Sequence, residues 1–422
     1  GNFEIGVHIA DASHFVRPGT PIDKEARKRT TSIYLVDRVI PMLPEILSND
    51  LCSLLPKKDR LTFSAVFEIN DKGKIFSEWY GKTVINSDKR FSYEEVQKIL
   101  EGHEGEYRRE LGMLNKIAKN LRRERIAAGS VLLNSVEIKF KLDEKGKPVE
   151  IYKKEQKDAH KLVEEFMLLA NRKVAEQVYK RGDDKGTLFV YRNNELPNNE
   201  KIEDLKEVLV NLGYKVNKKK TGMDSKEINA VIDEFEGRKE GSLVMWIILR
   251  SMSKADYSTK NIGHFGLAFG SYTHFTSPIR RYPDIMVHRL LNAHLKGQEI
   301  GDREDYEKMC KHSSEMERKA MNAERESIKY KQVEFMADKI GNIYTGVITS
   351  ISEYGMYLEA KETLCEGMVA YRNMKDDYYT ADKKLLSVTG QKKHKKYKIA
   401  DEVKIEVVSA DLKNRTIDYR IV

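Results

Sequence analysis

The chain has 422 residues and a mass of 48.8 kDa, a length that favours two or three domains, each with its own core. Hydrophobic residues make up 40% and charged residues 33%, with 9 prolines and 26 glycines, which excludes a disordered, collagen-like or mucin-like chain. The net charge of +9 and the pI near 9.0 favour polyanionic partners, although composition alone does not separate nucleic acid from a merely basic surface.

The cysteines and the apolar runs restrict the compartment. Three cysteines, Cys52, Cys310 and Cys365, lie far apart, so neither a disulfide framework nor a Cys-x-x-Cys metal site can be built from them. Apolar runs such as Leu243 to Leu249 fall far short of the roughly 20 residues of a membrane span, and no signal region begins the chain. We therefore expect a soluble cytoplasmic protein. Because residue 1 is not Met and a strand pattern starts at Phe3, the chain is expected to begin inside a domain.

The first 338 residues predict a mixture of antiparallel strands and helices with no internal linker. Alternating runs flank strong turns at residues 70–73 and 143–146, which is typical of hairpins. Strands are predicted over residues 3–9, 32–40, 61–69, 74–85, 131–142, 148–152, 187–191 and 265–269. Helices are predicted over residues 24–29, 96–100, 107–128, 159–179, 201–212, 225–235, 242–252 and 304–339. A capping box at Ser92 and Glu95 opens the second of them, and one further helix is predicted to run through Leu291.

The last 80 residues or so change character. They contain short alternating runs at residues 344–351, 355–358, 403–409 and 416–421. A longer insertion around residues 375–398 suits an OB-fold barrel of about five strands. The predicted fold class is therefore α+β: a large mixed domain of antiparallel sheets flanked by helices over residues 1–338, followed by a small all-β OB-fold barrel over residues 339–422.

The sharpest local feature is the segment TSPIRRYPD at residues 276–284. Pro283 suits the first turn of a helix, and Pro278 constrains the turn before it. Arg280 and Arg281 are thus predicted to lie at a helix N-terminus, where free N–H groups, the helix dipole and guanidinium forks suit a phosphate. An ordinary solvated arginine pair at a turn stays open as the alternative.

Acidic and histidine side chains offer weaker candidates. His8, Asp11 and His14 recur every three residues, but on a strand they point to opposite faces, so they converge on a metal only if the strand ends near residue 10. Asp11 and His14 are interpreted as polar groups at the end of the strand, with Asp11 kept as a candidate metal ligand.

Two further acidic positions lie in predicted helices. One of Glu164 and Glu165 must lie near the apolar face of its helix, where an unpaired carboxylate is costly. We expect a cation, metal or ribose hydroxyl as its partner, unless the residue merely marks the boundary of that face. Glu324 lies in a helix charged throughout, where an intrahelical pair is the default.

Tyrosines in the predicted barrel could bind bases. Tyr344, Tyr354 and Tyr357 occupy strand or turn positions near lysines and arginines, which is typical of a stacking platform for single-stranded nucleic acid. Ordinary sheet aromatics are the alternative. A short basic run over residues 392–396 lies in the insertion.

Four long segments carry a recognisable pattern. They are GNFEIGVHIADASHFV at residues 1–16, SIYLVDRVIPMLPEILSNDLCS at 32–53, VEEFMLLAN at 163–171 and YTHFTSPIRRYPDIMVHRLL at 272–291. In this order they resemble the ribonuclease II and ribonuclease R family, closest to its bacterial ribonuclease R branch, over residues 1 to about 338. The C-terminal barrel resembles the OB-type RNA-binding domain of that family. The resemblance implies a processive hydrolytic exoribonuclease that degrades single-stranded RNA from the 3′ end to nucleoside 5′-monophosphates, with Mg²⁺ in a two-metal arrangement.

The resemblance also assigns roles to individual residues. It implies that Arg280 contacts the scissile phosphate and stabilises its developing charge. Tyr34 and Tyr93 would flank the last nucleotides, and Tyr93 would set how short a product stays bound. Glu164 would read the terminal ribose, and Glu324 would line the RNA path.

The chain departs from the family pattern in several ways. The acidic motif that holds the metal ions, which the family places just upstream of the first strand, is absent from these residues. Upstream cold-shock-type domains and a lysine-rich tail are absent as well. Leu132 stands where the family often has an aromatic residue that clamps the bases.

Three hypotheses follow from this pattern. The first is the truncated catalytic domain and barrel of a ribonuclease R-like exoribonuclease, a monomer that binds single-stranded RNA and no membrane; the resemblance leaves the activity of these 422 residues alone open. The second is a non-catalytic single-stranded RNA-binding protein, or an inactive fragment, that retains the RNA channel but lacks the metal-binding aspartates. The third is an unrelated metallohydrolase that uses His8, Asp11 and His14.

Overall fold

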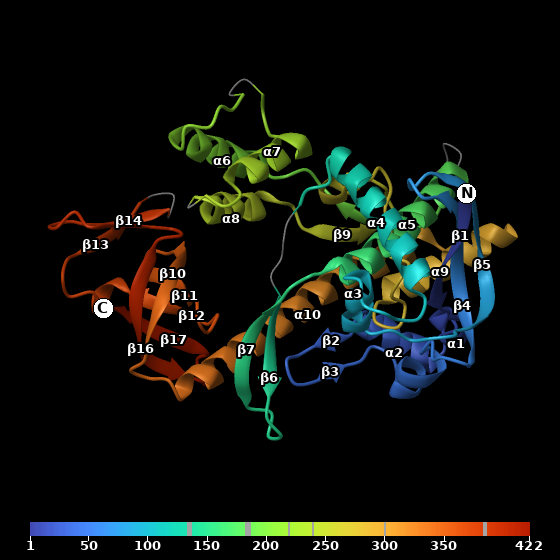
Figure 1. Cartoon of the computed structure of the whole chain (residues 1–422), viewed down its shortest axis with the longest axis horizontal. Helices are drawn as coiled ribbons and strands as arrows, with labels where there is room; N and C mark the ends of the chain where they lie inside the picture. The colour runs from blue at the N-terminus through green and yellow to red at the C-terminus, as the bar shows by residue number, and fades with distance from the viewer. Residues whose placement is uncertain (133–136, 182–186, 218–219, 239, 299–300, 383–385) are drawn as a thin grey trace.

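The computed structural model describes residues 1–132, 137–181, 187–217, 220–238, 240–298, 301–382 and 386–422. The N-terminal sheet and the C-terminal barrel lie at opposite ends of the molecule, with helices between them (Figure 1). Among the described residues, no helix is both long enough and apolar enough to cross a lipid bilayer.

A three-stranded antiparallel sheet in the order β1-β4-β5 forms the N-terminal end. Its strands are β1 (Asn2–Ala10), β4 (Asp59–Asn70) and β5 (Ile75–Asn86). Alternation along β4 places Phe63, Phe67 and Ile69 fully in the core. Gly73, with a φ of +93°, supplies the left-handed residue that the turn between β4 and β5 requires. The strands predicted in these three regions are confirmed.

Helices cover this sheet and pack on one another. The helices of this part are α1 (Ala12–Phe15), α2 (Pro21–Arg29), α3 (Tyr93–Leu100), α4 (Arg108–Ala127) and α5 (Asp158–Arg181). Helix α5 contacts β1, α3 and α4, so it lies at the centre of the N-terminal half. The Ser92 hydroxyl caps α3 by accepting a hydrogen bond from the Glu95 N–H at 3.1 Å, while the Glu95 carboxylate pairs with Lys89 at 3.3 Å.

The predicted continuous strand over residues 32–40 is wrong. These residues form a tight hairpin of β2 (Ile33–Tyr34) and β3 (Val39–Ile40). The hairpin is closed by a hydrogen bond of 2.9 Å from the Leu35 N–H to the Arg38 carbonyl. Asp37 binds the Arg38 guanidinium at 2.7 Å within the turn, so two polar residues reverse the chain where alternation suggested continuity. A π-helical turn, η1 (Ile46–Leu51), follows.

The strand predicted over residues 187–191 begins later in the chain than expected. The observed strand is β8 (Tyr191–Asn194), and it pairs antiparallel with β9 (Ala255–Ser258). The sequence analysis did not predict β9, because its four residues are too few to show alternation.

The strand predicted over residues 265–269 is also wrong. This stretch forms a 3₁₀ turn, η2 (Phe265–Leu267). The His264 imidazole accepts a hydrogen bond from the Leu267 N–H at 3.3 Å, and Ala268 adopts a left-handed φ of 55°. The backbone of this turn also bonds to distant residues, because the Gly266 carbonyl accepts from the Val131 N–H at 2.9 Å and the Gly266 N–H donates to the Asn194 side chain at 2.9 Å.

Three short helices form a cluster with its own core. They are α6 (Asn199–Asn211), α7 (Ser225–Phe235) and α8 (Gly241–Ser251), and all three match predictions. Their fully buried side chains pack together and are Ile202, Leu205, Leu209, Ile228, Val231 and Ile248.

A long helix joins the two ends of the molecule. After α9 (Tyr282–Lys296), helix α10 (Arg303–Ala337) runs for 35 residues, or about 50 Å, from the mixed part to the barrel (Figure 1). The hairpin of β6 (Glu137–Leu142) and β7 (Pro148–Lys154) packs against it through β7. Val333 and Met336, in its last two turns, belong to the same hydrophobic core as the barrel.

The C-terminal strands close into a barrel in the order β10-β11-β12-β17-β16, as predicted for an OB-fold. The strands are β10 (Ile343–Ile351), β11 (Gly355–Ala360), β12 (Glu366–Ala370), β16 (Glu402–Asp411) and β17 (Thr416–Ile421). The sequence analysis did not identify β12. Its Gly367 lets β17 approach closely, because a Cβ atom there would lie 2.6 Å from the Tyr419 ring.

The insertion in the barrel has structure of its own. After the turn η3 (Tyr371–Asn373), it forms a small antiparallel sheet of β13 (Tyr379–Ala381), β14 (Ser387–Gly390) and β15 (Lys396–Lys398). The basic run over residues 392–396 spans the turn between β14 and β15 and the first residue of β15, and all five of its side chains are exposed.

Candidate active site

A cavity of about 380 Å³ opens between α5 and the segment over residues 272–281. The α5 side chains that line it recur every three or four residues, which places them on one face of the helix; they are His160, Val163, Glu164, Met167, Leu168 and Asn171. The opposite wall is lined by Tyr272, His274, Thr276, Ser277, Arg280 and Arg281. Tyr93, at the start of α3, also lines the cavity.

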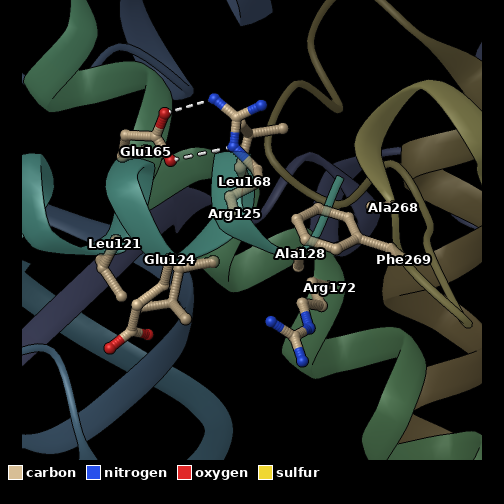
Figure 2. A pocket seen from close by; sticks show the side chains of 10 residues that line it. Leu121, Glu124, Arg125, Ala128, Glu165, Leu168, Arg172, Ala268 and Phe269 are labelled. Atoms are coloured by element: carbon tan, nitrogen blue, oxygen red, sulfur yellow. Dashed lines mark hydrogen bonds and ion pairs between the residues drawn. The ribbon is translucent and has the colours of Figure 1, made fainter. Parts of the chain in front are cut away.

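Two consecutive glutamates of α5 face different environments. The Glu164 side chain is 44% exposed and lines the cavity. Glu165 is 3% exposed and accepts hydrogen bonds from the Arg125 guanidinium at 2.5 and 3.3 Å. Figure 2 shows this pair beside a second, smaller cavity between α4 and α5. The cation predicted to accompany one of the two glutamates is therefore Arg125, which binds Glu165, while Arg122 lies farther away, 3.7 Å from Glu165 and 4.0 Å from Glu164.

The loop that carries Arg280 is fixed by backbone hydrogen bonds to the residues before β2. The Ser32 N–H donates to the Arg280 carbonyl at 3.0 Å, and the Tyr282 N–H donates to the Thr30 carbonyl at 2.8 Å. The Arg280 side chain is exposed and lines the cavity. No hydrogen bond or ion pair joins its guanidinium to another described residue, so all its N–H donors are available to a ligand.

Arg281 has a different environment. Its guanidinium donates two hydrogen bonds of 2.8 Å to the Asp284 carboxylate, which is fully buried, while the Arg281 side chain is 17% exposed. Asp284 also accepts a hydrogen bond from the Ser277 N–H at 2.7 Å. Arg281 thus anchors the loop to the first turn of α9, and its predicted contact with substrate stays a prediction.

Tyr93 forms a flat aromatic surface with a histidine of α5. Its ring lies 4.3 Å from the His160 ring with an interplanar angle of 9°, and Tyr93 remains 42% exposed. Burial lowers the pKa of His160, with a further decrease from Lys154. The imidazole is therefore neutral at pH 7, and the stacked pair offers an uncharged π-face beside the cavity.

Comparison with protein families decides the identity of this fold. A model of the RNB domain matches residues 1–297, which include every residue lining the cavity. The chain belongs to the RNB family. A model of the S1 RNA-binding domain matches residues 337–421, the region of the barrel.

Individual RNB relatives agree with this assignment. The chain is 41% identical over 438 residues to ribonuclease R of Thermotoga maritima and 38% identical over 435 residues to that of Aquifex aeolicus, in each case covering 100% of this chain and 60% of the relative. Among solved structures, RNase R of Mycoplasma genitalium in complex with ribose methylated single-stranded RNA matches with a TM-score of 0.92 and 29% identity, covering 100% of this chain and 67% of that one. The chain therefore spans little more than half of the length of these curated relatives.

Tyr34 and Glu324 do not line the RNB cavity. They lie on two elements that contact each other, β2 and α10. Tyr34 is on β2, and the N–H of nearby Val36 donates to the Ser327 hydroxyl of α10 at 3.1 Å, one helical turn from Glu324. Both side chains are exposed. The hydrogen bond between Ser32 and Arg280 connects this region to the cavity, and the predicted RNA contacts of Tyr34 and Glu324 stay predictions.

The three tyrosines of the S1 domain do not share one face. Tyr354, in the turn after β10, is 78% exposed, and Tyr357 alternates with the buried residues of β11. Tyr344 has the same parity as the buried Gly346 and Ile348 on β10 and packs against the barrel core. The structure therefore separates Tyr344 from the other two, and the interpretation as ordinary sheet aromatic suits it best.

The residues proposed for metal binding do not converge. The Asp11 carboxylate is 2% exposed and binds Lys82 at 2.7 Å and the Ser13 hydroxyl at 2.5 Å. Burial alone would raise the pKa of Asp11, but the His288 imidazole 3.9 Å away and the contacts with Lys82 and Ser13 lower it well below its usual range. A carboxylate already neutralised in this way is a poor ligand for Mg²⁺.

The two histidines of the same motif lie in other environments. His8 bonds to the Ser64 hydroxyl at 2.6 Å, and His14 packs edge-on against Phe15. Over the part of the chain that the structure describes, no three His, Cys, Asp or Glu side chains gather into a metal site. The described residues therefore do not fit the two-metal arrangement that the resemblance implies.

Sequence reasoning missed two polar residues of the RNB cavity. Asn171 joins its walls, because its amide donates to the Tyr272 hydroxyl at 3.1 Å and its carbonyl oxygen accepts from the Phe275 N–H at 2.8 Å. His274 lies on the opposite wall. An amide on the apolar face of a predicted helix was the available signal for Asn171. Leu132 does not line this cavity; its N–H donates to Asn229 of α7 at 3.4 Å.

Proposed function

We propose that this RNB chain supplies the RNA-binding cavity and barrel of a 3′-to-5′ exoribonuclease that hydrolyses single-stranded RNA processively to nucleoside 5′-monophosphates. The observation that carries the proposal is the uncommitted Arg280 guanidinium, which lines one cavity together with a carboxylate, Glu164, and a stacked aromatic ring, Tyr93. A guanidinium, a carboxylate and a π-face match the phosphate, the ribose hydroxyls and the base of a nucleotide.

Each of these groups would perform one task on the 3′-terminal nucleotide. Arg280 would donate to the non-bridging oxygens of the scissile phosphate, whose negative charge increases towards the transition state. Glu164 would accept a hydrogen bond from a ribose hydroxyl, and Tyr93 would stack on a base. RNase R of Mycoplasma genitalium has been solved in complex with ribose methylated single-stranded RNA, which supports the same class of ligand.

The proposed dependence on Mg²⁺ rests on residues other than those described. Mg²⁺ prefers several converging oxygen ligands, and the described residues do not form such a set. We therefore propose that Mg²⁺ is bound by the acidic motif that the family pattern places just upstream of β1. Residues 1–422 are not proposed to bind the metal.

The cytoplasm is the compartment that we propose. Cys52, Cys310 and Cys365 are all buried and free of disulfides. Burial raises the pKa of the Cys52 thiol to about 12, so this thiol stays protonated and inert. Buried free thiols are typical of proteins from a reducing compartment.

A non-catalytic RNA-binding protein is the second candidate function. The curated relatives, which are named ribonuclease R, do not favour it. Both candidates predict RNA binding, and only the first predicts cleavage when the acidic ligands are supplied.

The test compares two forms of the protein on 5′-labelled oligoadenylate with Mg²⁺ or EDTA. One form is the chain itself, and the other carries the acidic segment of the Thermotoga maritima relative fused before Gly1. We expect the fused form to shorten the RNA from its 3′ end in single-nucleotide steps with Mg²⁺ and not with EDTA. RNA that is bound by both forms but shortened by neither would support the non-catalytic alternative.

The basic turn of the S1 insertion should bind the RNA backbone. Replacing Lys392, Lys393, Lys395 and Lys396 with Gln should weaken binding of oligoadenylate in EDTA. For single strands, the slope of log K against log salt is negative, and each lost phosphate contact makes it shallower by about 0.7. A matched variant with the same charge change, Lys24, Lys28, Lys72 and Lys74 to Gln, should keep the slope. Equal slopes for both variants, measured by fluorescence anisotropy, would contradict a role for this turn.

A further inference from the structure

His274 occupies the wall of the cavity opposite α5 and is held by its neighbours. The Thr273 hydroxyl donates to the Val190 carbonyl at 2.7 Å, and the Arg192 N–H donates to the Tyr272 carbonyl at 2.8 Å. These bonds fix the two residues before His274 to the start of β8. On the other side, the Phe275 N–H donates to the Asn171 side chain at 2.8 Å, so the His274 imidazole occupies a defined position.

The imidazole of His274 has one fixed partner. Its Nδ1 atom lies 2.7 Å from the hydroxyl of Tyr257 on β9. Tyr257 is 5% exposed, and burial raises the pKa of its phenol, so the hydroxyl keeps its proton. Among the described residues, Nδ1 of His274 is the acceptor within reach of that proton. A buried hydroxyl proton without an acceptor is costly, so Tyr257 donates and Nδ1 accepts.

This hydrogen bond determines the tautomer. With Nδ1 as the acceptor, a neutral imidazole carries its proton on Nε2. Burial, followed by the charges of Arg281 and Arg192, lowers the pKa of His274 well below its usual value, so a second proton is not bound at pH 7. No described residue hydrogen-bonds to the Nε2 atom. This atom is not among the fully buried polar atoms without a partner, so it is accessible to solvent. Since His274 lines the cavity, this N–H is open to a ligand there.

We propose that the Nε2–H of His274 donates a hydrogen bond to a backbone phosphate oxygen of RNA in the cavity, and that Tyr257 is the positioning residue that fixes this tautomer. The proposal rests on the proposed function, because it assigns a residue to RNA bound at that site. A phosphate is the expected acceptor because His274 shares its wall with the guanidinium groups of Arg280 and Arg281. The neutral Nε2–H of His274 and the charged guanidinium of Arg280 could then donate to the same anionic phosphate.

The tautomer is tested without RNA. In the chain labelled with ¹⁵N-histidine, the His274 resonances are assigned by their loss in the His274→Asn variant. We expect the Nδ1 shift of an unprotonated nitrogen and the Nε2 shift of a protonated one. In Tyr257→Phe, the two shifts should move towards each other because both tautomers become populated. A protonated Nδ1 in the unmodified chain would overturn the proposal.

The contact is tested by binding in EDTA, where no RNA is cleaved. Adding oligoadenylate should move the Nε2 resonance, and a methylphosphonate at the last linkage should reduce that change. Gln at position 274 can place an amide N–H near the position of Nε2, whereas Asn places it near Nδ1. We therefore expect His274→Asn to bind about tenfold more weakly than the unmodified chain, and His274→Gln to recover most of that loss.

Each outcome has a distinct meaning. Failure of the unmodified chain to bind oligoadenylate would overturn the proposed function together with the contact. Normal binding with an unmoved Nε2 resonance, or equal binding by His274→Asn and His274→Gln, would overturn the contact alone. An undiminished shift with the methylphosphonate would show that the acceptor is another group of the RNA.

Discussion

Replacing Arg280 with alanine should lower the turnover of RNA by about 10² to 10³-fold, the usual cost of losing one preorganised donor to a developing charge. The affinity for RNA should fall little, because the other cavity residues and the barrel still bind the substrate. The effect is expected to be this large because no described residue shares the guanidinium of Arg280, which lines the cavity without a competing partner. The measurement is single-turnover cleavage of oligoadenylate by the form that carries the acidic segment.

Two further variants separate charge from geometry. Arg280→Lys keeps the positive charge but loses the planar fork, so it should recover only part of the rate. Arg109→Ala removes an exposed arginine of α4 and should leave both rate and affinity unchanged. If Arg280→Ala lowered affinity by the same factor as turnover, the contact would be made equally in the ground state, and the proposed role in the transition state would be wrong.

Replacing Asp284 with alanine should destabilise the protein by about 3–5 kcal/mol, the cost of leaving a buried charge without its partner. Asp284 is fully buried, and its carboxylate accepts two hydrogen bonds from Arg281 and one from the Ser277 N–H. Removing it leaves the Arg281 guanidinium uncompensated and frees the turn that presents Arg280. The free energy of unfolding is measured by urea denaturation followed by circular dichroism.

A double variant distinguishes the pair from its individual members. Arg281→Met combined with Asp284→Leu replaces both charges with apolar groups of similar size and should be much less destabilising than Asp284→Ala alone. Glu25→Ala, which breaks the exposed pair with Arg29, is the control and should have little effect. A double variant as unstable as the single one would show that the hydrogen bond to Ser277, rather than the uncompensated charge, provides the stabilisation.

Sequence reasoning succeeded where a local pattern and a local physical rule agreed. The turn at residues 70–73 predicted the hairpin of β4 and β5, and the prolines around Arg280 predicted a constrained turn before a helix. The expectation that one of Glu164 and Glu165 needs a buried partner was correct. The sequence could not name Arg125 as that partner, because the two residues meet only when α4 packs on α5.

The errors arose where short segments depend on distant contacts. Residues 32–40 alternate like one strand, yet a polar turn at Asp37 reverses them. The stretch over residues 265–269 is apolar like a strand, but the side chain of His264 caps it into a turn. The role of His274 could not be predicted from periodicity, because it depends on Tyr257 of β9, which meets the His274 loop only in the folded chain.

The way in which α10 ends has a consequence for protein engineering. Val333 and Met336 lie inside the hydrophobic core of the barrel, although they belong to a helix that begins in the mixed domain. A barrel excised at residue 339 would lose three side chains of this core, Val333, Met336 and Ile151 of β7, so a transplanted S1 module should carry at least the final turns of this helix. Because the end of α10, strand β7 and the barrel share this core, the helix acts as a rigid strut between the two parts of the molecule rather than as a tether.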